Sequence, residues 1–359
     1  MPIEIQIDWQ RAEQLFDALL TSKRLRLSPY DSAEAPQVGE NLPKSLKPQT
    51  REHALFLFCS CYYMRGGNQS DVALSSLGRL YDENPSLFDP KYLIGEIDSR
   101  FSEEHVNYDH LVRLIRQAID TEPGLHYKAP EISEHWVKNF TKLFRFWDSD
   151  PINLFKDVSD HETAYGILMN KKVSRKDREK SPRGFLGFQE KMASMLIYFL
   201  RDAGLISKFV FPVPVDFHIL RILVGHKILF AEGEEVGGNV FGESLKRAAR
   251  EVTFEYCKKH DVDPIELGDS MWFLSRSLCR WHPGNTVRKG EYKARKTPLA
   301  PVPVTWSETQ YRRYQRSCLK CPTDISKTCT FNVPSAHYYS IGQLVPLHVR
   351  SKPLTLFPM

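Results

Sequence analysis

The sequence lacks any apolar run long enough to cross a membrane. Its longest apolar stretches, such as residues 54–63, reach only half of the roughly 20 residues that a membrane helix needs. The first ten residues also lack the basic start and apolar centre of a secretory signal peptide. We therefore expect a chain that has no membrane partner and is not secreted.

The sequence also lacks the even number of cysteines that a framework of disulfides would use. The chain has 359 residues and seven cysteines, a count that does not suggest a disulfide framework. We therefore expect a reducing compartment, where thiolates persist as metal ligands. Cys318 and Cys321 form a Cys-x2-Cys pair, and Cys329 follows. This spacing suits a metal ion or an iron–sulfur cluster, because two thiolates separated by two residues can bind the same centre.

Regular alternation of apolar and polar residues is scarce, and apolar residues mostly recur at helical spacing. The fold class that this pattern predicts is all-α. The expected helices cover residues 8–20, 51–63, 70–81, 104–119, 133–147, 160–169, 184–200, 216–230, 243–260 and 269–279, with a further helical stretch around 306–316.

Charge of one sign is not in large excess, since the net charge is +5 and the pI is near 8.7. This mild basicity is compatible with a polyanionic partner but identifies none. The cations are nevertheless clustered: residues 171–183 hold seven Lys or Arg against two acids. That segment is either a solvated loop or a phosphate-contacting insertion. A second concentration lies within residues 280–317: Arg288, Lys289, Lys293, Arg295, Lys296, Arg312, Arg313 and Arg316.

Two residues in the centre of the chain have a structural and a chemical interpretation. Asp216 follows an extended Pro-x-Pro-Val stretch and precedes an apolar helix, so its carboxylate is expected to cap that helix at the positive end of the dipole. Lys191 follows a glycine-containing turn, where backbone N–H groups at the helix start can bind a phosphate. Each residue alone could be an ordinary cap or a surface lysine.

Taken together, these residues resemble a known family. Residues 185–193 (FLGFQEKMA) are similar to the hairpin signature LPGVGxKxA, and residues 214–218 (PVDFH) to the signature PVDxH. Both belong to the helix-hairpin-helix DNA glycosylases of the endonuclease III-like superfamily. Residues 272–279 (WFLSRSLC) resemble the Trp- and Cys-bearing helix of its iron–sulfur branch. The resemblance covers roughly residues 50–330.

The resemblance implies a role for each candidate residue. The expected function is excision of a damaged, mismatched or modified base from double-stranded DNA. Asp216 would stabilise positive charge on the sugar, and Lys191 would form a Schiff base that permits β-elimination. Candidate DNA-contacting residues are Arg183, Gly184, Gly187 and Gln189, with Gln69 filling the space of the extruded base. A [4Fe-4S] cluster, with zinc as the alternative, would be bound by Cys279, Cys318, Cys321 and Cys329.

The family also implies an organisation and a setting. We expect a helical barrel domain with the hairpin motif at residues 45–205, a second helical domain with the iron–sulfur loop at 1–44 plus 206–333, and a C-terminal tail at 334–359. The protein is expected to be a monomer in the cytoplasm, at the nucleoid, or in the nucleus.

Departures from the family pattern leave two other functions open. Gln189 replaces the second glycine of the hairpin, and 38 residues separate Cys279 from Cys318. A non-catalytic iron–sulfur DNA-binding protein that keeps the fold is one alternative. A glycosidase for a free nucleoside or nucleotide, which would not need the hairpin, is the other.

Overall fold

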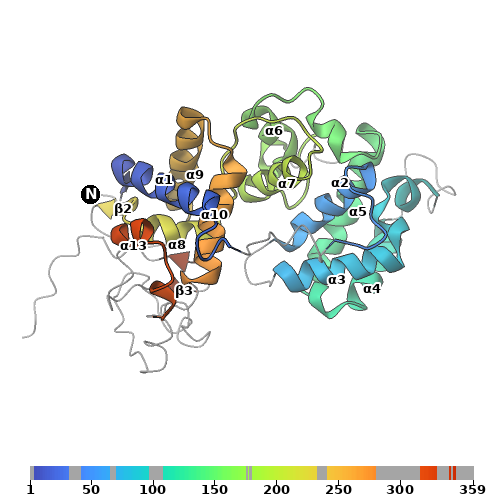
Figure 1. The fold of residues 1–359 in the computed structure, drawn as a ribbon. Helices are drawn as coiled ribbons and strands as arrows, with labels where there is room; N and C mark the ends of the chain where they lie inside the picture. Colours follow the sequence, from blue (N-terminus) through green and yellow to red (C-terminus); the bar gives the residue numbers. More distant parts are fainter. Residues whose placement is uncertain are drawn as a thin grey trace, which may run out of the picture. The chain divides into compact units, whose positions relative to one another are not determined.

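The computed structural model describes residues 4–31, 42–64, 70–96, 108–174, 177, 180–232, 241–279, 316–329, 339–340 and 343–344. Helix dominates this part of the chain, as the all-α prediction requires (Figure 1). Within the described residues, no helix is both long and apolar enough to cross a membrane.

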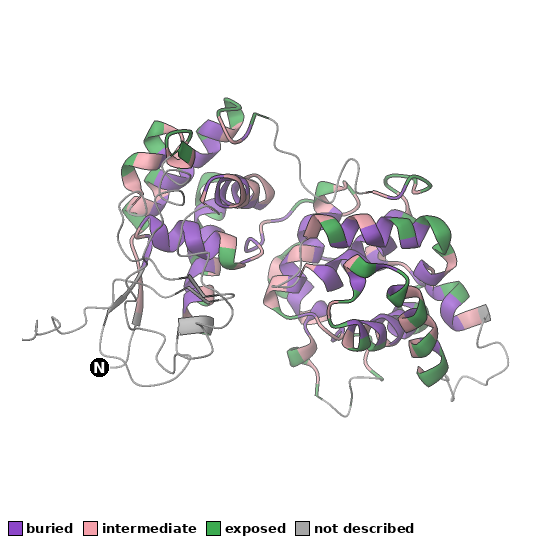
Figure 2. Cartoon of the chain, turned by 90° about the horizontal axis from the view of Figure 1, so that it is seen from below, coloured by how far each residue is buried: buried purple, intermediate pink, exposed green. Residues whose placement is uncertain are grey.

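The chain forms two compact units, and the first is built from both ends of the sequence. Unit 1 comprises residues 1–33 and 215–359, and unit 2 comprises residues 34–214. The boundaries expected from the sequence lay at 44/45 and 205/206. In each unit the buried residues lie on the helix faces that are directed inward (Figure 2).

Unit 2 is organised around helix α2, whose apolar sequence leaves no polar face and which is accordingly buried along most of its length. The Phe58 ring of α2 lies 5.1 Å from Phe188, 5.8 Å from Phe185 and 6.5 Å from Phe140, measured between ring centroids. The aromatic core of this unit therefore includes the two phenylalanines that flank the predicted hairpin turn. The helical elements of unit 2 are α2 (Arg51–Ser60), η2 (Cys61–Tyr63), α3 (Ser70–Glu83), η3 (Pro85–Phe88), η4 (Lys91–Glu96), α4 (Tyr108–Asp120), η5 (Pro123–Leu125), α5 (Ala129–Phe146), η6 (Pro151–Phe155), α6 (His161–Leu168), η7 (Asn170–Lys172) and α7 (Glu190–Asp202).

Unit 1 joins the N-terminal helix to helices from the second half of the chain. Tyr256 donates a hydrogen bond to Asp17 at 2.5 Å, Lys23 pairs with Asp269 at 3.0 Å, and Tyr30 donates to a backbone carbonyl of α10. The elements of unit 1 are β1 (Glu4–Ile7), α1 (Trp9–Arg24), α8 (Phe217–Gly225), β2 (Leu229–Glu232), α9 (Phe241–His260), α10 (Pro264–Ser277), α13 (Thr323–Thr328), β3 (Tyr339–Ser340) and β4 (Gln343–Leu344).

The structure corrects one helix predicted from the sequence. The helix expected over residues 216–230 ends at Gly225, because the chain turns at Lys227, which has a positive φ of 57°. Residues 229–232 then form β2, which pairs antiparallel with β1. The two strands are four residues each and lie at distant points of the sequence, so their pairing is not signalled by neighbours in the chain.

Candidate functional site

The predicted hairpin turn is a tight turn fixed on the core of unit 2. Phe188 donates its backbone N–H to the carbonyl of Phe185 at 3.2 Å, and Gly187 between them has φ +82°. This left-handed value favours glycine. The Asn139 side chain accepts from the Leu186 N–H at 2.7 Å and donates to the Leu186 carbonyl at 2.9 Å. The core and α5 therefore hold the turn in one conformation.

Helix α7 begins directly after this turn and has no side-chain cap. Gln189 is the N-cap residue, is exposed, and makes no capping hydrogen bond with its side chain. The first N–H groups of a helix have no partner within the helix, and the dipole makes this end positive. Lys191 lies in the first turn, is half-buried, and donates from Nζ to the Met64 carbonyl at 2.7 Å.

Helix α8, in unit 1, begins with an acidic N-cap residue. Asp216 is its N-cap, and Oδ1 accepts from the N–H groups of His218 at 2.8 Å and Ile219 at 3.2 Å, so the predicted cap is confirmed. The second oxygen, Oδ2, accepts no hydrogen bond from the described residues. The carboxylate is half-buried. The two hydrogen bonds at Oδ1 therefore fix the orientation of Oδ2.

The residues beneath Asp216 are tied to α10 through one serine. The His218 ring nitrogen Nδ1 hydrogen-bonds the Ser275 hydroxyl at 3.0 Å. The buried Arg221 donates to the same hydroxyl at 2.9 Å and to the Ser275 carbonyl at 3.1 Å. The partner of the His218 ring is thus a side chain 57 residues away. Lys191 belongs to unit 2 and Asp216 to unit 1.

The four cysteines of the predicted metal site form one group in unit 1. Cys279 directly follows α10, while Cys318, Cys321 and Cys329 flank the short helix α13. Burial raises the pKa of the Cys279 thiol well above its usual range, and the neighbouring thiols of the other three raise it further. Burial and the nearby Cys329 and Cys318 raise the pKa of Cys321 to about 12. The four thiols are thus close enough to influence one another.

This donor set fits a thiolate-bound metal centre. Crowded, buried thiols favour the protonated form, and a bound cation reverses that preference because it binds thiolates. Among the residues that the structure describes, no three His, Cys, Asp or Glu side chains already stand in an arrangement that would hold one metal ion. Cys59 and Cys61, on α2 and η2, are fully buried in the core of unit 2. Cys257 is also buried, and acidic groups rather than other thiols are its charged neighbours.

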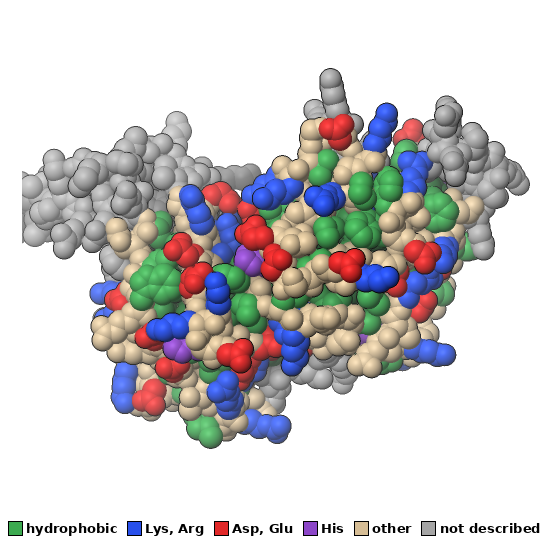
Figure 3. Space-filling view, turned by 90° about the horizontal axis from the view of Figure 1, so that it is seen from above, with side chains coloured by type: hydrophobic (Ala, Val, Ile, Leu, Met, Phe, Trp, Pro, Cys, Tyr) green, Lys and Arg blue, Asp and Glu red, His purple; other side chains and the backbone are tan. Residues whose placement is uncertain are grey.

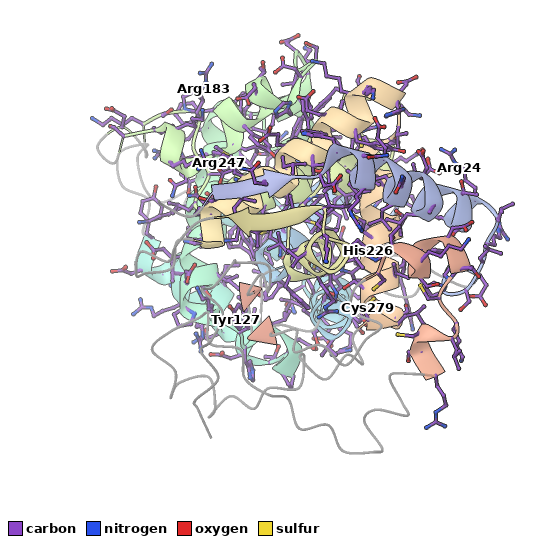
Figure 4. All side chains as sticks on the ribbon, turned by 90° about the vertical axis from the view of Figure 1, so that its left-hand side faces the viewer. Arg24, Tyr127, Arg183, His226, Arg247 and Cys279 are labelled. Carbon is purple, nitrogen blue, oxygen red and sulfur yellow. The ribbon has the colours of Figure 1, made fainter. Side chains whose placement is uncertain are left out.

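Two residues that the sequence did not suggest also border the cysteine group. Tyr30 is buried and lies near Cys279 and Cys321, whose charges contribute, after burial, to a raised pKa of its hydroxyl. His226 hydrogen-bonds the Thr328 hydroxyl through Nδ1 at 2.8 Å, directly before Cys329. Figure 4 labels His226 and Cys279 within this unit. No sequence signal marks either residue, because each depends on a partner far along the chain.

The structure describes only some of the other residues that the sequence analysis singled out. Gln69 and residues 280–315 lie outside the described residues. Arg183 is exposed, and Gly184 has φ +78°. Of the aromatic stripe on α5, Trp136 and Phe140 are fully buried in the core, whereas Phe144 is 39% exposed.

Comparisons with known proteins name no family for this chain. Searches against protein-family models and against curated proteins both found no match. The proposals below therefore rest on the residues themselves and on the resemblance described above.

Proposed function

We propose that this protein is a DNA glycosylase of the helix-hairpin-helix type. The observation that carries the proposal is the carboxylate of Asp216, with Oδ1 engaged by two backbone N–H groups and Oδ2 not hydrogen-bonded by the described residues. A fixed carboxylate oxygen of this kind suits a reaction that develops positive charge, because no reorganisation is needed as the charge forms.

Cleavage of the bond between base and sugar develops positive charge on the sugar. The enzyme must first extrude the nucleotide from the stacked duplex. Oδ2 of Asp216 would then stabilise the charge at the anomeric carbon and orient the attacking nucleophile. The start of α7, where the N-cap Gln189 makes no capping hydrogen bond with its side chain, would bind a DNA phosphate.

Lys191 supports a second step that follows base excision. Its amine would condense with the anomeric carbon of the abasic sugar, opening the ring and releasing water to form a Schiff base; loss of a C2′ proton then expels the 3′ phosphate by β-elimination. The contact with the Met64 carbonyl holds the side chain in place before the substrate arrives. A nucleophilic lysine must lose its proton before it attacks.

The four thiols support a [4Fe-4S] cluster as the cofactor, with zinc as the alternative. Its role would be structural, joining the segment after Cys318 to α8 and α10. Purified protein should then show a broad visible absorption band and a yellow-brown colour. A colourless protein that contains stoichiometric zinc would decide for zinc. Cys329→Ser should lose either signal, whereas Cys257→Ser, a matched control at a buried core thiol, should retain it.

The proposed function is tested by screening a panel of duplexes, each with one damaged or mismatched base, for excision. Wild-type protein should excise at least one base, and Asp216→Asn should not. Borohydride should trap wild-type protein on abasic-site DNA. A Lys191→Ala protein that is trapped equally well would refute the Schiff base while leaving base excision intact.

One observation favours the non-catalytic alternative. The exposed Gln189 places a side chain where close approach of a phosphate favours glycine. Duplex binding without excision of any base in the panel would support a binding protein. Hydrolysis of free nucleosides without duplex binding would support the nucleosidase instead.

A further inference from the structure

The basic segment between α6 and α7 is a loop whose two ends meet. Gly184 packs on Val173 so closely that a Cβ at Gly184 would lie 2.8 Å from the valine side chain. Nearer to α7, Asn170 donates its N–H to the Phe188 carbonyl at 3.0 Å, and Lys171 forms an ion pair with Glu190, the first residue of that helix. The described ends of this segment therefore meet and form a fixed base.

The returning arm of the loop is held by polar side chains from α5. Lys142 is only 5% exposed, and its Nζ donates to the carbonyls of Ser181 and Arg183, each at 2.8 Å. Trp147, which ends α5, donates from Nε1 to the intervening Pro182 carbonyl at 2.9 Å. Three consecutive backbone carbonyls are therefore bound by two side chains.

A solvated loop does not need this arrangement. Burial of an ammonium group is unfavourable unless hydrogen bonds compensate it, and here the compensating groups are the carbonyls of an exposed, basic segment. The cations that this base presents are Lys172, Lys180 and Arg183, all exposed. Within the described residues, none of the three takes part in an ion pair. Arg183 lies at the outside of the molecule in Figure 4.

One face of the molecule carries charges of both signs. Lys and Arg side chains alternate with Asp and Glu across the face drawn in Figure 3. A local cluster of cations on a fixed base suits a partner with regularly spaced negative charges, and the phosphodiester backbone of a duplex is such a partner.

We propose that Lys172, Lys180 and Arg183 form a strip that contacts the phosphate backbone of duplex DNA, with Lys142 and Trp147 fixing the backbone of its residues 181–183. This inference rests on the proposed function, because it takes DNA as the partner. It adds a binding surface beside the hairpin turn that is independent of the residues acting on the base. The strip positions the duplex and carries no base specificity.

The experiment measures binding of a short undamaged duplex by fluorescence anisotropy at several salt concentrations. The slope of log affinity against log salt changes by about 0.9 for each phosphate that the protein no longer neutralises. The triple variant K172A/K180A/R183A should therefore reduce the magnitude of the slope by about two to three. A matched control, K47A/K128A/K208A, removes three exposed lysines from the same unit and should leave the slope unchanged.

Each outcome decides the proposal. An unchanged slope in the strip variant, or an equal reduction in the control, overturns the strip while leaving DNA as the partner. Absence of duplex binding by wild-type protein at low salt overturns the proposed function together with the strip. The variant Lys142→Met keeps all three surface cations. If it folds, as checked by circular dichroism, but binds as tightly as wild type, the positioning role of Lys142 is wrong.

Discussion

Helices α7 and α8 begin in similar ways, but only α8 has a side-chain cap. Each follows an irregular segment, and each has its N-cap residue in an extended conformation. The α8 start is capped by an anion, the Asp216 carboxylate, whereas the N-cap of α7 is an exposed glutamine, with Glu190 and Lys191 in the first turn. The Asp216 carboxylate repels phosphate; the neutral cap of α7 does not oppose the attraction of the positive helix end for an anion.

This difference divides the proposed chemistry between the two helix starts. Under the proposed function, an anion bound at α7 would be a phosphate of the DNA substrate, because the N-cap of this helix is not acidic. The anion at α8 is part of the protein and, under the proposed function, would stabilise positive charge that appears only during reaction. Substitutions at three residues test the roles of these two helices.

The largest effect is expected at Asp216. Asn keeps a side-chain oxygen that can accept from His218 and Ile219 but removes the charge, so base excision should fall by about 100- to 1,000-fold with little change in stability. Ala should lose excision equally and also cost about 1 kcal/mol of stability through loss of the cap. Single-turnover excision and thermal unfolding separate the two effects. Equal excision by Asn and wild type would show that Asp216 is only a cap.

An intermediate effect is expected at the far end of α8. Burial, with a smaller contribution from the Arg11 charge, lowers the pKa of His226 to about 3, whereas an unfolded histidine titrates near 6.5. The unfolded chain therefore binds more protons between these values, and stability is lost as pH falls from 6.5 toward 3. We expect a loss of about 2 kcal/mol between pH 7 and pH 5.

The control for this effect is His226→Gln, which has no titratable ring. Its unfolding free energy, measured with urea, should depend less steeply on pH than that of wild type. Acid also protonates thiols and weakens metal binding, but that effect is shared by both proteins and cancels in their difference. Parallel pH dependences would contradict a neutral, buried His226.

The smallest effect is expected from giving α7 an acidic N-cap residue like that of α8. Gln189 already has the extended backbone that an N-cap requires, so Gln189→Asp should stabilise unit 2 by about 1 kcal/mol. The new carboxylate should also repel phosphate and weaken duplex binding about tenfold, which corresponds to 1.4 kcal/mol. Gln189→Asn gives the cap without the charge and should stabilise without weakening binding. Tighter binding by the Asp variant would exclude a phosphate at α7.

Features set by neighbours in the sequence could be predicted. The Asp216 cap follows from an extended stretch joined to an apolar helix, and most helices were predicted from apolar spacing alone. Features that depend on distant partners could not. The burial of Lys142 requires the carbonyls of Ser181 and Arg183, and nothing near Lys142 in the sequence indicates them. The same applies to His226, whose partner Thr328 lies about 100 residues away.

The pairing of β1 with β2 has a consequence for synthesis of the chain. Glu4 pairs with Glu232, so the N-terminal strand leaves the ribosome long before its partner exists. At 5–20 residues per second, the delay is about 10 to 45 s. All of unit 2 is made within that interval and can fold first. Meanwhile the apolar face of α1 stays uncovered, which makes the nascent N-terminus a candidate binding site for a chaperone.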